Sequence, residues 1–233
     1  SETEYEICRE LIEGGHIPDD VTIQVLVQAR EHLIRRTFEA IRGAKNVIVH
    51  FYNSTSTLQR KVVFHKEMDG IIGIAVEGAR LIRELTESYE GDTRIRYEYS
   101  PESFSGTEMD NAVAICAAVM EALGSTKENP VILNLPNTVE MCTPNTYADQ
   151  IEYFIRHLPS LDYVIPSVIG HHEHYDGKGY PRRIAGEDIP LGARILCIAD
   201  SFDAMISQRS YKQPYPLEKA LHILLEEAGR QFD

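Results

Sequence analysis

The chain has 233 residues, and 36 acidic against 23 basic side chains give a formal net charge of −13 at pH 7. This charge argues against non-specific binding to DNA or to an anionic membrane, and a hydrophobic share of 43% suffices for one large core or two small ones. No stretch is long and apolar enough to span a membrane, and the first residues lack the apolar core of a signal peptide. Four scattered cysteines without C-x-x-C spacing are typical of reduced thiols. We therefore expect a cytoplasmic protein with neither a DNA nor a membrane partner.

Strand and helix patterns alternate over the first two thirds of the chain. The predicted strands cover residues 21–27, 46–50, 94–99 and 131–135. The predicted helices cover 1–13, 31–42, 58–88 with a break near Gly70, 107–123 and 143–158. From residue 164 the pattern indicates helices only: one over 164–173, then one whose apolar seam is Leu191, Ile195, Ile198, Phe202 and Met205.

Polar residues gather where the later strands end, at 50–55, 100–103 and 134–140. Four βα units imply parallel pairing with right-handed crossovers. Groups at the carboxyl ends of successive strands are typical of a (β/α)8 barrel, and no Gly-rich phosphate loop follows the first strand, which argues against a dinucleotide fold. The fold class we predict is α/β of the TIM-barrel type.

Residues 1–158 resemble the central part of 2-isopropylmalate synthase, an HMGL-like barrel enzyme, in the segments DDVTIQVLVQAR, VIVHFYNSTSTLQRKVVF, YEYSPESFSGTE and NLPNTVEMCTPNTYADQIEYF. The resemblance implies a partial (β/α)8 barrel of about four units and a Claisen-type condensation of acetyl-CoA with 2-oxoisovalerate, assisted by Mg, Mn or Zn. It implies that Glu102 supports proton transfer as a catalytic residue. It implies a 2-oxo-acid pocket lined by His50, Ser100, Asn134, Pro136 and Thr138. The alternative is that these residues only cap strands and helices at a barrel rim.

The family's metal ligands have poor counterparts here. Its D-x-T-x-R-D-G-type segment is missing, and the nearest H-x-H is His172-Glu173-His174, followed by Tyr175-Asp176 rather than Asn-Asp. We interpret that H-x-H as a coincidence. The chain alone is therefore expected to have negligible synthase turnover.

Residues 159–233 resemble instead the C-terminal half of an HD-GYP phosphodiesterase, over HHEHYDGKGYPRRIAGEDIPLGARILCIADSFDAMISQRSYK. The resemblance implies hydrolysis of cyclic di-GMP or a related cyclic dinucleotide at an iron or manganese cluster. It implies that His171, His172 and Asp200 are metal ligands and that Arg209 and Lys212 contact phosphates. The family's H-D dyad is absent, so this site is also incomplete, and a surface histidine run with solvated cations is the alternative.

The sequence thus predicts a composite of two domains, 1–158 and 159–233, whose origin as an engineered chimera, a gene fusion or a remnant stays open. Three functions remain: a synthase-like acyltransferase acting on a 2-oxo acid, a metal-dependent phosphodiesterase, and a non-catalytic binding scaffold. A half-barrel leaves strand edges unpaired, so we expect the helical tail or a homodimer to cover them.

Overall fold

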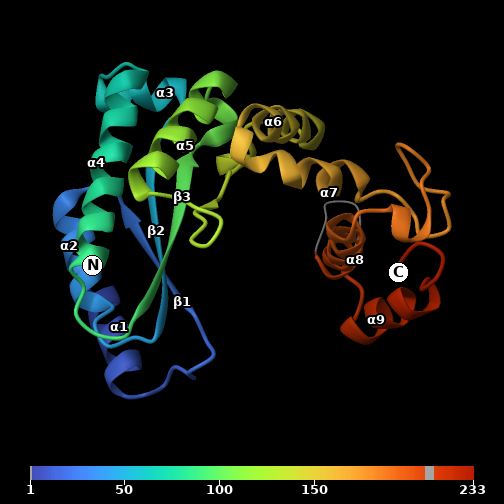
Figure 1. Ribbon diagram of the computed structural model, residues 1–233, viewed down its shortest axis with the longest axis horizontal. Coiled ribbons are helices and arrows are strands. Elements are labelled where there is room, and N and C mark those ends of the chain that lie inside the picture. The colour runs from blue at the N-terminus through green and yellow to red at the C-terminus, as the bar shows by residue number, and fades with distance from the viewer. Residues whose placement is uncertain (1, 208–212) are drawn as a thin grey trace. The chain divides into compact units, whose positions relative to one another are not determined.

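The computed structural model describes residues 2–207 and 213–233, and the chain divides after Phe154 into two compact units (Figure 1). The sequence-based boundary lies nearby, after Leu158. Within the described residues, no helix has both the length and the hydropathy that a membrane crossing requires.

A four-stranded parallel sheet forms the centre of the first unit, in the order β1-β2-β3-β4. Its strands are β1 (Ile23–Gln28), β2 (Asn46–Ser54), β3 (Arg94–Glu102) and β4 (Ile132–Leu133). A doubly wound sheet reverses its strand order at a switch point, whereas a barrel adds parallel strands in chain order. The sequential order therefore fits a partial (β/α)8 barrel, and it confirms the predicted α/β class with parallel pairing.

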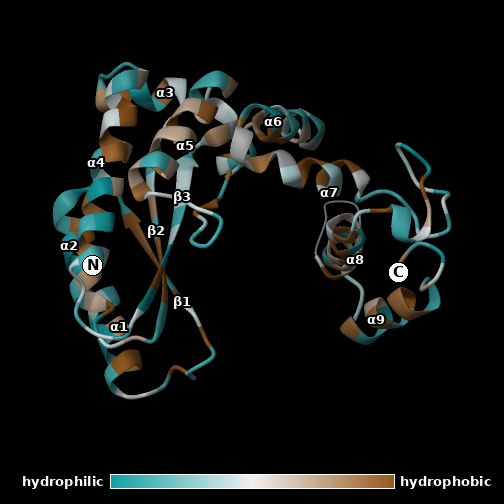
Figure 2. Ribbon diagram, viewed as in Figure 1, coloured by the Kyte–Doolittle hydropathy of each residue, from teal (hydrophilic) through white to brown (hydrophobic). Residues whose placement is uncertain are grey.

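Helices cover one face of this sheet. They are α2 (Glu31–Ala40), α4 (Met68–Glu87) and α5 (Met109–Leu123). The first helix, α1 (Glu2–Glu13), packs on α2, and the short α3 (Thr57–Gln59) follows β2. In the βα units, α2 packs on β1, α4 on β2 and α5 on β3. Because side chains alternate along a strand, Val47, Val49 and Phe51 point into this packed layer and are fully buried. Figure 2 shows the apolar colours concentrated along much of β1 and β2.

The predicted break in the long helical region near Gly70 is present, and it lies at residues 65–67. A π-helical turn, Arg60–Phe64, follows α3 and ends at His65, whose φ of 51° is left-handed. Glu67 is extended, and α4 begins at Met68, so Gly70 sits inside the first turn of α4. The left-handed residue rather than the glycine interrupts the helix.

The second unit begins within α6 (Pro144–His157), and its described regular elements are helices. They are a 3-10 segment (Pro159–Val164), α7 (Ile165–Gly170), a 3-10 turn (Gly186–Asp188), α8 (Leu191–Ile206) and α9 (Leu217–Glu226). Shorter 3-10 turns in the first unit span Phe104–Gly106 and Thr138–Glu140.

The predicted apolar seam of α8 is wrong in part. Leu191 and Ile195 are 61% and 58% exposed, whereas Ala193, Cys197 and Met205 are the buried residues of this helix. A Cβ atom at Gly170 of α7 would lie 3.1 Å from the Cβ of Ala193. The two helices approach closely, so a face of small residues is buried in place of the larger apolar side chains.

Candidate functional site

A chain of hydrogen bonds joins β1, β2, β3 and the residue after β4 on the sheet face opposite the helices. Gln24 Nε2 lies 2.9 Å from His50 Nδ1, and His50 Nε2 lies 2.7 Å from Ser100 Oγ. Asn134, just after β4, donates from Nδ2 to the same Ser100 Oγ at 2.8 Å. We call Gln24, His50, Ser100 and Asn134 the cross-strand network.

The strand register explains why these residues meet. Leu26 pairs with His50 across β1 and β2, and Tyr52 pairs with Ser100 across β2 and β3. Residues two apart share a face, so Gln24, His50 and Ser100 follow a diagonal across neighbouring strands. His50 and Ser100 are buried, whereas Gln24 and Asn134 at the two ends are exposed.

Burial sets the charge of the central histidine. It lowers the pKa of His50, and the neighbouring Glu98 carboxylate raises the pKa by a smaller amount. Glu98 Oε1 lies 3.4 Å from His50 Nδ1, and both side chains are almost fully covered. His50 is therefore neutral near neutral pH, with one nitrogen that donates and one that accepts.

Glu102 and Thr138 are held by separate contacts where β3 ends. The Ser54 hydroxyl donates to Glu102 Oε2 at 2.6 Å, and the backbone N–H of Ser103 donates to Thr138 Oγ1 at 3.0 Å. Ser103 and Val139 both have left-handed backbones, with φ of 61° and 54°. Residues with side chains seldom adopt this conformation, and it is concentrated at functional loops.

The structure thus joins three residues of the predicted pocket directly: His50, Ser100 and Asn134. Glu102 and Thr138 lie at the end of β3 and in the turn that contacts it, and Pro136 lies in the loop between β4 and that turn. Sequence reasoning missed Gln24 and Glu98. The signal for Glu98 was its spacing of two from Ser100, and a similar alternation places Gln24 on this face of β1.

In the second unit, the two adjacent histidines lie beyond the helix that was predicted to carry them. The predicted helix over 164–173 is shorter in the structure, since α7 ends at Gly170 and neither histidine belongs to it. Their ring centroids are 4.0 Å apart, and His172 also stacks on Tyr180 at 4.8 Å. Burial and then His171 lower the pKa of His172, while Asp200 acts in the opposite direction. Asp200 is thus within electrostatic range of His172.

These residues do not form a ligand set as they stand. Over residues 2–207 and 213–233, no three His, Cys, Asp or Glu side chains are grouped as a metal ion would need. The buried Glu173 carboxylate accepts the backbone N–H groups of Arg182 and Arg183 instead. The metal assignment of His171, His172 and Asp200 stays a prediction. Arg209 and Lys212 lie outside the described residues.

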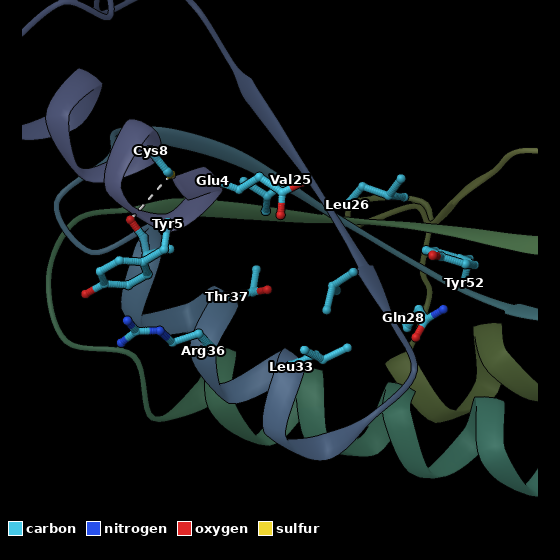
Figure 3. A pocket seen from close by; sticks show the side chains of 12 residues that line it. Glu4, Tyr5, Cys8, Val25, Leu26, Gln28, Leu33, Arg36, Thr37 and Tyr52 are labelled. Carbon is cyan, nitrogen blue, oxygen red and sulfur yellow. Dashed lines mark hydrogen bonds between the residues drawn. The ribbon is translucent and has the colours of Figure 1, made fainter. Parts of the chain in front are cut away.

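A cavity of about 570 Å³ lies beside β1, between α1 and α2 (Figure 3). None of the four network residues lines it. Its cation, Arg36, lies 3.5 Å above the Tyr5 ring and pairs with Glu2 and Glu39. Because its guanidinium is already engaged, this cavity offers weaker chemistry than the cross-strand network.

Comparisons with known proteins found relatives for the first three quarters of the chain. Residues 1–177 match the family model described as HMGL-like. The 2-isopropylmalate synthase of Pseudarthrobacter chlorophenolicus is 56% identical over 177 residues, which are 76% of this chain and 30% of that protein. The 2-isopropylmalate synthase of Corynebacterium glutamicum is 56% identical over 179 residues, 77% of this chain and 29% of that protein. That of Rhodospirillum rubrum is 57% identical over 173 residues, 74% of this chain and 31% of that protein.

The chain spans about 30% of the length of the curated relatives it matches. The family match runs past residue 158 and includes His172-Glu173-His174. The interpretation of that H-x-H as a coincidence stays a prediction. These comparisons give the predicted HD-GYP resemblance no support.

Proposed function

We propose, since this chain belongs to the HMGL-like family, that it carries part of the 2-oxo-acid pocket of a 2-isopropylmalate-synthase-like acyltransferase. The observation that carries this proposal is the cross-strand network, which presents polar side chains from β1, β2 and β3 and from the residue after β4 on one face of the sheet. A small polar acid needs a few convergent hydrogen-bond groups, and the loops at strand ends are where barrel enzymes hold them.

In this proposal the chain's own residues bind the acid and position one carboxylate. The Ser100 hydroxyl and the Asn134 amide hold oxygens of the 2-oxo acid. Ser54 occupies one oxygen of Glu102, which leaves the other oxygen to accept a proton from a reacting group. A divalent metal in such an enzyme polarises the keto group. Because the described residues gather no set of metal ligands, we assign no step to a metal and expect negligible turnover from this chain alone.

Calorimetry with 2-oxoisovalerate tests the pocket. We expect measurable binding to the unmodified chain and a loss of about tenfold or more in His50→Ala, because Ser100 then loses a buried hydrogen-bond partner. His32→Ala, on the exposed side of α2, is the matched control and should bind as the unmodified chain does. Equal affinity in the unmodified chain and in His50→Ala would contradict the proposal.

A phosphodiesterase acting on a cyclic dinucleotide is the second candidate, and it rests on the contact between the His171 and His172 rings and on the electrostatic effect of Asp200 on His172. Manganese titration of the unmodified chain and of His172→Ala tests it. Tight binding that is lost in the variant supports this candidate, and equal binding opposes it.

A non-catalytic scaffold stands if neither the acid nor the metal binds. For each of the three candidate functions we propose that the protein is cytoplasmic, because its four cysteines are free thiols.

A further inference from the structure

The amide of Gln24 reaches the ring nitrogen of His50 that does not face Ser100. We infer that Gln24 is a positioning residue: it fixes His50 in the tautomer with its hydrogen on Nε2, so that the Ser100 hydroxyl must donate to the bound ligand. The inference deepens the proposed 2-oxo-acid pocket and rests on it for the identity of that ligand.

The first step concerns the imidazole. An amide nitrogen can only donate, so the Gln24 Nε2 contact at 2.9 Å requires His50 Nδ1 to accept. In a neutral ring the hydrogen is then on Nε2, which points to Ser100 Oγ at 2.7 Å. Glu98, which could instead accept a hydrogen from Nδ1, is farther away at 3.4 Å.

The second step concerns the serine. Ser100 Oγ lies within hydrogen-bond distance of His50 Nε2 and of Asn134 Nδ2, and both are donors in this arrangement. A hydroxyl oxygen has two acceptor sites and one hydrogen. With both acceptor sites used, the hydrogen of Ser100 is directed to a third group. The matching ligand group is an oxygen that accepts, such as the carboxylate or keto oxygen of a 2-oxo acid.

The third step concerns what happens without the amide. Gln24 is exposed on β1, so Gln24→Leu removes the donor without opening a hole in the core. Glu98, an acceptor, is then the remaining neighbour of Nδ1 among the contacts described above. The hydrogen is expected to move to Nδ1, which turns Nε2 into an acceptor. Ser100 would then donate to His50, and its hydrogen would be lost to the ligand.

Nitrogen NMR of the imidazole rings tests the tautomer at about pH 8, where the neutral ring dominates. The His50 signals are assigned by their loss in His50→Gln. We expect the Nε2–H tautomer in the unmodified chain and a shift toward Nδ1–H in Gln24→Leu. Gln28→Leu, which changes the same side chain on the same strand, is the control and should leave the spectrum of His50 unaltered.

Calorimetry with 2-oxoisovalerate provides the second readout. Affinity should fall about tenfold or more in Gln24→Leu, as expected for a lost charge-assisted hydrogen bond, and stay unchanged in Gln28→Leu. A Nδ1–H tautomer in the unmodified chain, or an unchanged tautomer in Gln24→Leu, overturns the inference. If the tautomer responds as expected but no chain binds the acid, the proposed ligand fails and the role of Gln24 in setting the tautomer stands.

Discussion

At the scale of single residues, the cross-strand network depends on a neutral His50. Burial, opposed in part by Glu98, holds its pKa below the ordinary value of 6.5. As the pH falls through 6.5, His50 is protonated in the unfolded chain before it is protonated in the folded chain. The free energy of unfolding therefore decreases on acidification and is restored as the pH rises above that value.

We predict that replacing His50 with glutamine reduces this loss of stability. Urea unfolding at about pH 7.5 and about pH 5.5 gives the change in the free energy of unfolding, which should be smaller in His50→Gln than in the unmodified chain. Other titrating groups are common to both proteins, so the comparison isolates His50. His32→Gln should retain the original pH dependence. An identical change in His50→Gln would show that His50 titrates alike in both states.

The residues of this network differ in how far sequence could predict them. His50, Ser100 and Asn134 stand in polar clusters where strands end, and a family resemblance covers them. Gln24 lies in the first half of β1 between apolar residues, where the alternation gives the face of the strand but not a partner for Gln24. Only the register of β1 against β2 brings it to His50, and register depends on pairing between segments far apart in sequence.

At the scale of elements, one ion pair joins the π-helical turn to the start of α5. Arg60 donates to both carboxylate oxygens of Glu108, at 2.6 and 2.8 Å, and Arg60 is itself buried. The contact lowers the pKa of Glu108 to about 2 from 4.5. A depressed carboxyl pKa stabilises the fold above 4.5, and this contribution is lost as the pH falls toward 2.

We predict that Glu108→Gln lowers the free energy of unfolding by about 1 kcal/mol at neutral pH, because a buried guanidinium loses its counter-charge. The estimate is modest since the Glu108 side chain is 50% exposed and therefore screened by solvent. Urea unfolding measures it, with Glu121→Gln on the exposed side of α5 as the control. A variant as stable as the unmodified chain down to about pH 3 would contradict this role.

The elements themselves were predictable, and their limits were less so. Runs such as NVIVH read as strands because β-branched residues favour them. The strands β2 and β3 nevertheless continue to Ser54 and Glu102, since Tyr52 pairs with Ser100 and Ser54 with Glu102. Polar site residues have weak strand propensity, so pairing with the neighbouring strand, which a local pattern does not contain, decides where these strands end.

At the scale of the whole molecule, β1 is an edge strand of the described sheet and carries an exposed leucine. Leu26 is 63% exposed on the face that holds His50. An unpaired edge with an apolar side chain favours association with another chain.

We predict that light scattering after size exclusion detects dimers of the unmodified chain and only monomers of Leu26→Lys. Leu225→Lys, at a 76% exposed position on α9, is the control. A monomeric unmodified chain would refute the predicted homodimer.

The division into two compact units has a consequence for unfolding, because each unit has its own buried core. Ile82 of α4 is fully buried in the first unit, and Ile189 is 1% exposed in the second. Truncating a buried isoleucine to alanine costs roughly 2–5 kcal/mol in the core that contains it. Two cooperative units should therefore respond separately to the two substitutions.

We accordingly predict two calorimetric transitions. Ile82→Ala should lower the midpoint of one transition and Ile189→Ala that of the other, and the double variant should lower both by the sums of the separate shifts. Distant sites in independently folding units add, whereas sites in one cooperative core shift a single transition together. A single transition whose midpoint is lowered by either variant would mean that the two units unfold together. The boundary after Phe154 would then separate two compact units that are not independent in unfolding.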